Sequence, residues 1–146
     1  MNECNIIIPT YWCSAYRGKD GDNATEQVIR DNVKTAIGLG LKIGKDFPQF
    51  QLTVPHKELI CNQLWKDNKV TSEDIVRSCC KIVLLHKLLI AYGAVYGGMI
   101  QEILTAEANG ITVYYMDEYN EQAKYELSQI AYNLLEMSEP SEDRDS

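Results

Sequence analysis

Short apolar runs alternate along the chain with longer segments in which apolar residues recur every three or four positions. Apolar runs without polar alternation are typical of strands buried on both faces of a sheet, and the longer spacing is typical of helices packed on one. The runs predict strands over residues 5–9, 50–54, 81–85 and 111–115. The spacing predicts helices over 57–66, 72–78, 99–108 and 118–137, and one from residue 24 to the region of Gly38 and Gly40.

Strands that alternate with helices, each strand apolar throughout, indicate a parallel sheet covered on both faces by right-handed crossovers. We therefore expect an α/β fold, a single-domain Rossmann-like three-layer sandwich around a mostly parallel sheet of four or five strands. The domain is expected to span residues 1–137, followed by a disordered acidic tail over 138–146. Ligands bind beyond the carboxyl ends of such strands, so chemistry is expected after Pro9, Val54, Leu85 and Tyr115. The apolar stretch 88–95 is interpreted as a loop that forms a dimer surface or a lid.

Charge and hydropathy narrow the range of partners. The net charge of −7, from 14 basic and 21 acidic residues, repels a nucleic-acid backbone, so no nucleic-acid polymer is expected as a partner. The longest stretch without a charged residue, 88–101, is well short of the roughly 20 apolar residues that span a bilayer. No basic segment followed by an apolar one opens the chain, so we expect no membrane partner and a cytoplasmic location.

The cysteines and histidines do not follow a metal-binding pattern. None of the 5 cysteines forms a Cys-x-x-Cys pair or lies near His56 or His86 at the spacing of zinc ligands. We therefore expect no metal, no cofactor, and reduced thiols that serve as small apolar side chains. His56 and His86 follow predicted strands and are candidate bases, and His56 is also a candidate ligand contact.

The segment 9–18 is rich in residues that suit a small ligand. Aromatic faces bind a nucleobase or a sugar, Arg17 can bind a phosphate through two hydrogen bonds, and Gly18 lets the backbone approach a ligand. The candidate residues of this predicted loop are Tyr11, Trp12, Ser14, Tyr16, Arg17 and Gly18. The alternative is that Tyr11 and Trp12 cap the edge of the core.

A second candidate is the pair Gly97 and Gly98, which opens the helix over 99–108 and brings Glu102 into its first turn. Backbone N–H groups at such a turn can bind an anion or a hydroxyl, and the helix dipole stabilises a carboxylate there. Asp74 has the corresponding position in the helix over 72–78. Taken alone, each acid is explained more readily by helix capping than by catalysis.

Three segments together resemble the nucleoside 2-deoxyribosyltransferase superfamily, which includes 2′-deoxynucleoside 5′-phosphate N-hydrolases and many phage proteins. The segments are the aromatic and Arg-Gly loop, Asp-Ile-Val-Arg-Ser-Cys-Cys-Lys-Ile-Val-Leu-Leu at 74–85, and Gly-Gly-Met-Ile-Gln-Glu-Ile-Leu-Thr-Ala-Glu-Ala-Asn-Gly-Ile-Thr-Val-Tyr-Tyr at 97–115. The resemblance runs from about residue 6 to residue 116.

The resemblance implies that Glu102 attacks the anomeric carbon of a nucleoside or nucleotide and forms a glycosyl ester. It implies that Asp74 holds a sugar hydroxyl and assists the leaving base, and that Tyr11 lies near the nucleophile. Arg17 with Gly18 matches a phosphate-binding loop, and Gly98 with Met99 would border the sugar. The resemblance also implies a homodimer or a larger homo-oligomer.

Three departures from the family pattern weigh against base transfer. Lys81 replaces an acid, the segment 92–96 lacks the acid that transferases direct at the base, and Pro140 with acids replaces a tyrosine-bearing tail. Two functions remain: an N-glycosidase, or a catalytically inactive protein that sequesters a nucleotide, such as an ADP-ribose-derived signal in phage evasion of host defence. A third possibility is a domain that only associates with a partner through 88–95.

Overall fold

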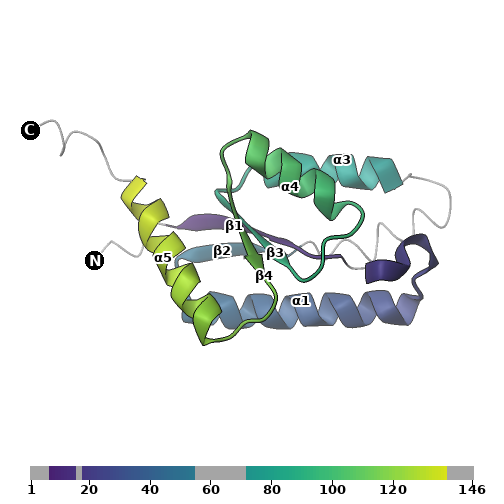
Figure 1. Cartoon of the computed structure of the whole chain (residues 1–146), viewed down its shortest axis with the longest axis horizontal. Helices are drawn as coiled ribbons and strands as arrows, with labels where there is room; N and C mark the ends of the chain where they lie inside the picture. The colour runs from purple at the N-terminus through teal and green to yellow at the C-terminus, as the bar shows by residue number, and fades with distance from the viewer. Residues whose placement is uncertain (1–6, 16–17, 55–71, 138–146) are drawn as a thin grey trace, which may run out of the picture.

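The computed structural model describes residues 7–15, 18–54 and 72–137. They form an α/β fold in which helices cover both faces of a four-stranded parallel sheet (Figure 1), which confirms the expected class. In chain order the elements are β1 (Ile8–Cys13), the short 3-10 helix η2 (Gly18–Asn23), α1 (Glu26–Asp46), β2 (Phe50–Thr53), α3 (Ser72–Val83), β3 (Leu88–Tyr92), α4 (Met99–Ala108), β4 (Thr112–Met116) and α5 (Glu121–Met137).

The strands follow one another across the sheet in the order β2-β1-β3-β4, and every neighbouring pair is parallel. The chain therefore moves outward from β1 to β2, then crosses back and continues in the opposite direction through β3 and β4. At such a reversal the connections after the two central strands run to opposite faces and leave a crevice, where sheets of this kind bind ligands. Here the reversal lies between β1 and β3, whose last paired residues are Cys13 and Ala91.

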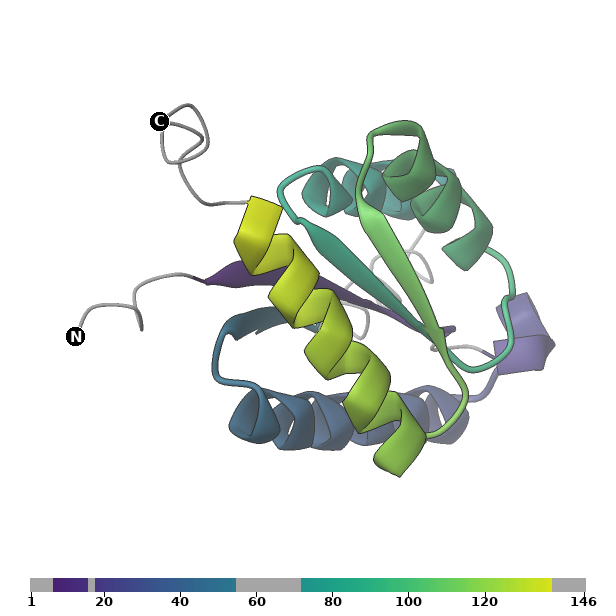
Figure 2. The same ribbon diagram turned by 60° about the vertical axis from the view of Figure 1, so that its left-hand side comes forward.

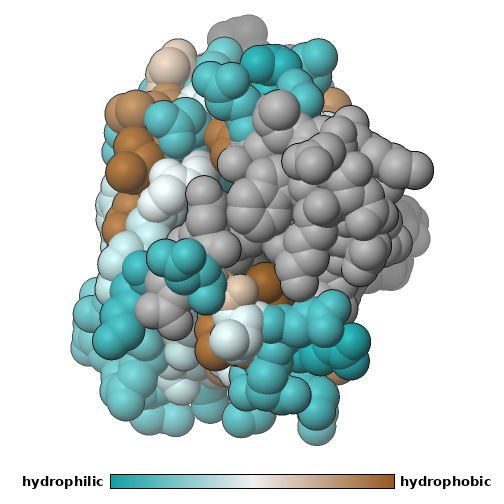
Figure 3. Space-filling model, turned by 90° about the vertical axis from the view of Figure 1, so that its right-hand side faces the viewer, coloured by the Kyte–Doolittle hydropathy of each residue, from teal (hydrophilic) through white to brown (hydrophobic). Residues whose placement is uncertain are grey.

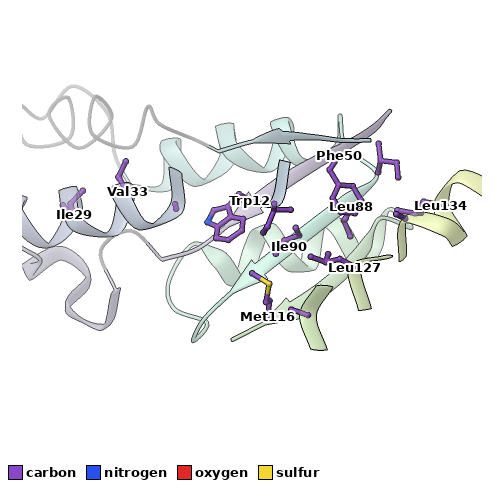
Figure 4. Packing of buried hydrophobic residues seen from close by; sticks show 14 residues of the cluster. Trp12, Ile29, Val33, Phe50, Leu88, Ile90, Met116, Leu127 and Leu134 are labelled. Carbon is purple, nitrogen blue, oxygen red and sulfur yellow. The ribbon is translucent and has the colours of Figure 1, made fainter. Parts of the chain in front are cut away.

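The two faces of the sheet carry different helices (Figure 2): α1 and α5 cover one face, and α3 and α4 cover the other. Side chains alternate between the faces along each strand, so two separate cores form. The larger core lies under α1 and α5 (Figure 4) and includes Trp12, Ile29, Val33, Phe50, Leu88, Ile90, Met116, Leu127 and Leu134. The smaller core lies under α3 and α4 and consists of Tyr11, Cys13, Val83, Leu89, Ala91, Met99, Ile103 and Ala106.

Helix α1 is one long helix with a capped start and glycines in its interior. Thr25 caps its first turn, where the Thr25 hydroxyl accepts a hydrogen bond from the backbone N–H of Val28 at 3.2 Å. The helix continues past Gly38 and Gly40, so the predicted end at these glycines is wrong. A Cβ atom on Gly40 would lie 2.9 Å from Cγ2 of Val54, so this glycine allows close packing rather than ending the helix.

Two strand predictions are also wrong. β1 covers Ile8–Cys13 instead of 5–9, so Tyr11 and Trp12 lie in a central strand and not in a loop. The strand predicted over 81–85 is the end of α3 and the turn after it, because a short apolar run does not distinguish a strand from one buried face of a helix. The first five residues of the stretch 88–95, which was interpreted as a loop, form β3. This strand is paired on both sides and buried at the centre of the sheet, so this part of the stretch cannot serve as a lid or a partner surface.

Two further predicted strands and two predicted helices agree with the structure. The strands predicted over 50–54 and 111–115 and the helices predicted over 99–108 and 118–137 are confirmed within three residues. The helix predicted over 57–66, the tail over 138–146 and residues 5–6 of the first predicted strand lie outside the described residues. In the described part of the chain, no helix combines the length and apolar character needed to cross a bilayer.

Candidate functional site

The carboxylate of Glu102 meets the thiol of Cys13 at the reversal point of the sheet. Cys13 is the last residue of β1, and Glu102 lies in the first turn of α4, the helix that follows β3. The Sγ atom of Cys13 donates a hydrogen bond to Oε1 of Glu102 at 3.1 Å. Cys13 is 1% exposed and Glu102 is half-buried, so the carboxylate lies between the core and the surface.

Tyr11 lies next to this pair on the same face of β1. Burial raises the pKa of Tyr11 well above its usual range, and the negative charge of Glu102 and a hydrogen bond with Cys79 raise it further. The pKa of the Cys13 thiol is raised in the same way, first by burial and then by Glu102. Both groups therefore stay protonated at neutral pH and remain hydrogen-bond donors.

Two glycines lead the chain into α4 and fix its position. Gly97 has a φ of +50°, a conformation that favours glycine, and a Cβ atom on Gly98 would lie 2.9 Å from Cγ2 of Val76 in α3. The start of α4 is therefore pressed against α3. The backbone N–H groups of Met99 and Ile100 donate to the carbonyls of Tyr96 and Gly97, so these two amides are occupied. The anion or hydroxyl site at Gly97 and Gly98 stays a prediction.

Asp74 lies in the first turn of α3, which runs beside α4 from the same end (Figure 1). The close approach of Gly98, the N-cap of α4, to Val76 of α3 joins the amino-terminal parts of the two helices, so Asp74 and Glu102 come from adjacent elements. The Asp74 side chain is 49% exposed, and its Oδ1 accepts a hydrogen bond from Nη1 of Arg77 at 3.1 Å. Its predicted contact with a sugar stays a prediction.

The remaining candidates of the first predicted loop have different surroundings. Trp12 is 0% exposed in the larger core, where its ring packs on Tyr92 at a centroid distance of 5.3 Å and its Nε1 donates to Oγ of Ser14 at 3.1 Å. Trp12 is therefore a residue of the core itself and does not cap its edge, and its predicted ligand contact stays a prediction. Gly18 has a φ of +62° and makes a turn in which its N–H donates to the carbonyl of Ala15 at 2.9 Å.

The other predicted ligand contacts stay predictions. Tyr16, Arg17 and His56 lie outside the described residues. Met99 is buried beneath α4 in the smaller core, and its predicted position beside a sugar stays a prediction, as do the ligand contacts of Ser14 and Gly18.

His86 does not lie at a carboxyl end, because it precedes β3 instead of ending a strand. Its Nδ1 lies 2.8 Å from the carbonyl oxygen of Ile82, and its Nε2 lies 2.8 Å from Oγ1 of Thr53. A carbonyl only accepts, so in the neutral ring Nδ1 donates to Ile82 and Nε2 accepts from the Thr53 hydroxyl. His86 thus ties the end of α3 to β2, and it lines a hollow of about 550 Å³ near the amino ends of β3 and β4.

Sequence reasoning missed Cys13 and Cys79, which it grouped with inert thiols. Once β1 is extended to Cys13, strand alternation places Tyr11 and Cys13 on one face at the carboxyl end of a central strand, and this pattern would have identified them. Cys13, Cys79 and Cys80 are free thiols. No group of three or more metal-ligating side chains occurs among the residues that the structure describes.

The surface at the carboxyl ends of the strands is seen in Figure 3. Much of its described part is hydrophilic, and apolar surface gathers on the side where α4 and the segment before it lie. The exposed large apolar side chains of this region include Val95, Ile100 and Leu104.

No family model, curated protein or solved structure matches the chain. The likeness to deoxyribosyltransferases therefore rests on the sequence motifs, and the roles that it implies for Glu102, Asp74 and Tyr11 stay predictions.

Proposed function

We propose that the protein cleaves the N-glycosidic bond of a nucleoside or nucleotide, with Glu102 as the nucleophile. One observation carries the proposal: the half-buried carboxylate of Glu102 lies at the reversal point of the sheet and accepts a hydrogen bond from Cys13. Small molecules bind at this point in doubly wound sheets. Hydrogen bonds to a carboxylate favour its charged form, which is the form that attacks carbon.

The proposed reaction has two steps. An oxygen of Glu102 forms a bond to the anomeric carbon while the bond from that carbon to the base nitrogen breaks, and the base leaves with the electron pair and takes up a proton. Water then attacks the anomeric carbon, the bond from that carbon to the Glu102 oxygen breaks, and one proton of the water passes to solvent. This step releases the free sugar and restores the carboxylate. The negative charge of Glu102 stabilises the oxocarbenium-like transition state of both steps.

Asp74 is the proposed partner of Glu102, since it begins the helix against which α4 is packed. In this role it orients a sugar hydroxyl and assists departure of the base. Arg17 and Gly18 are the proposed phosphate contacts if the substrate is a nucleotide.

A second candidate function is capture of a nucleotide without turnover. The sequence observation that favours it is the lack of an acid in the segment 92–96, where transferases carry one that acts on the base. The two functions require the same pocket and differ in whether product appears.

The test is a comparison of wild-type protein with Glu102→Ala on a panel of deoxynucleosides and their 5′-monophosphates, with free base measured by chromatography. We expect wild-type protein to release base and the variant to lose release while its ligand affinity stays within about tenfold, because a nucleophile contributes mainly to the transition state. Glu107→Ala is the matched control, since Glu107 is an exposed acid on the same helix.

Thermal unfolding with the same panel and with ADP-ribose separates the outcomes. Base release by Glu102→Ala at the wild-type rate contradicts the assignment of the nucleophile. Stabilisation by a nucleotide without any product identifies a capture protein. Neither product nor stabilisation with any member of the panel overturns the nucleotide ligand itself.

A further inference from the structure

We infer that Cys13 is a positioning residue for Glu102, which holds the carboxylate toward the anomeric carbon through its thiol hydrogen bond. The inference rests on the proposed function, because it assigns a part in that reaction. Its basis is the 3.1 Å contact from Sγ of Cys13 to Oε1 of Glu102, which joins residues 89 positions apart in the chain.

The two ends of this hydrogen bond are held by different parts of the fold. Cys13 ends the central strand β1, is paired with Ala91 of β3 and is buried. Glu102 belongs to α4, whose start is held against α3 by the close packing of Gly98 on Val76. A glutamate side chain has several rotatable bonds, and a fixed donor at one oxygen restricts its orientation. The sheet thus aligns a side chain that the helix supplies.

Within the ranges that the structure describes, four further titratable groups lie around the pair. They are Tyr11 from β1, Cys79 and Cys80 from α3, and Tyr115 from β4. None of these side chains can carry a positive charge, so none forms an ion pair with the carboxylate. Cys79 acts on Tyr11 instead, where it contributes to the raised pKa of the phenol. Cys13 is thus the thiol whose hydrogen bond reaches Glu102 directly.

The thiol suits positioning better than attack. A cysteine attacks carbon as its thiolate, and burial together with the charge of Glu102 raises the pKa of Cys13 far above its usual range. Cys13 therefore keeps its proton and continues to donate it to the carboxylate.

The test compares Cys13→Ala with Cys13→Ser, which keeps a donor of similar size at the same position. We expect Cys13→Ala to lower kcat about tenfold with little change in KM, the loss that follows from one modest hydrogen bond to a charged group. Cys13→Ser is expected to restore most of kcat. Cys80→Ala is the control, because Cys80 is a partly exposed thiol on α3.

The pH profile provides a readout that a merely structural role would not change. Loss of the donor disfavours the charged form of Glu102, so the acidic limb of kcat/KM should move upward by about half to one pH unit in Cys13→Ala. In Cys13→Ser the limb should return to its wild-type position. A 13C NMR titration of the Glu102 carboxyl carbon, assigned by its absence in Glu102→Gln, should show the same order of midpoints without any substrate.

Each outcome decides between the two proposals. If a folded Cys13→Ala variant keeps wild-type turnover and an unchanged acidic limb, the role of Cys13 is overturned. The proposed function then remains intact. Equal losses in the alanine and serine variants, both folded by thermal unfolding, also overturn it. Absence of product with wild-type protein overturns the proposed function and the catalytic role of Cys13 with it. An unchanged NMR midpoint in Cys13→Ala overturns the effect of the hydrogen bond on the carboxylate.

Discussion

Tyr11 and Trp12 are adjacent in the sequence and face opposite layers of the protein. Tyr11 points toward α3 and α4, where it lies near Glu102, and Trp12 points toward α1. Their residue types suggested something other than a plain connector, and the structure shows both in the central strand β1. The placement of both in a loop was wrong, because they lie in β1, where side chains alternate between the two faces. Their predicted ligand contacts stay predictions.

Cys13 should resist alkylation in the folded protein because the thiolate is the reactive form and its pKa is raised by burial and by Glu102. We expect iodoacetamide at pH 7.5 to modify Cys13 only after unfolding in guanidinium, as measured by mass spectrometry of peptides. Cys80, which is partly exposed, provides the comparison in the same sample. The Glu102→Gln variant removes the negative charge and should speed labelling of Cys13. Fast labelling of Cys13 in folded wild-type protein would contradict the prediction.

At the scale of the element, Pro9 explains why the first strand was placed too early. A proline lacks the N–H that a central strand needs and therefore suggests the end of a strand. In the structure the carbonyl of Pro9 accepts from Lys87, and pairing of β1 with β3 begins only at Thr10. The N–H and the carbonyl of one residue in a parallel strand point to the same neighbour. The side of Pro9 that lacks an N–H therefore faces the residues before β3, ahead of the first paired residue Thr10. The sequence alone does not contain this register.

The long elements were predicted well because their apolar pattern is repeated over several turns. In α5 one helix face carries Ala123, Leu127, Ala131 and Leu134, and all of these residues are buried. In α3 the buried positions are Ile75, Cys79 and Val83, and the last of them belongs to an apolar run that also fits a strand. Prediction from the local apolar pattern therefore fails where a short apolar run fits both a helical turn and a strand.

Two glycines of α1 provide a matched pair of substitutions. Gly38→Ala introduces a Cβ atom with no neighbour within 4 Å, so its higher helix propensity should raise the free energy of unfolding by about 0.5–1 kcal/mol. Gly40→Ala brings a Cβ atom to 2.9 Å from Val54 and should lower the free energy of unfolding by about 1–3 kcal/mol. Urea unfolding followed by circular dichroism measures both. The close packing of α1 on Val54 is contradicted if the two variants are equally stable.

At the scale of the whole molecule, the sequence predicted the layers and the structure adds the site. Alternation of apolar runs with helical periodicity was sufficient for an α/β fold with a parallel sheet, now found with four strands. The hydrogen bond between Cys13 and Glu102 depends on the order of the strands, which brings the end of β1 beside the helix after β3. No local pattern records that order. The candidate carboxylate was therefore identified from a motif, and its donor was not.

The candidate site lies on the side of the smaller core, and two buried leucines test whether this core alone keeps Glu102 in position. Leu127 in α5 belongs to the larger core, Leu89 in β3 belongs to the smaller core under α4, and both are 0% exposed. Each leucine-to-alanine change should lower the free energy of unfolding by about 2–5 kcal/mol, the usual cost of such a cavity. Only Leu89→Ala should also lower kcat for base release, by about tenfold to a hundredfold, because a shift of α4 misplaces Glu102.

This comparison requires conditions in which both variants are fully folded, established by urea unfolding before kcat is measured. The two variants then differ in one respect, the face of the sheet that has lost a side chain. A loss of kcat in Leu127→Ala as large as in Leu89→Ala would mean that the two layers move as one unit. Unchanged kcat in Leu89→Ala would mean that α4 keeps Glu102 in place without the side chain beneath it, which leaves the contacts with Cys13 and Val76 as the ones that hold the site.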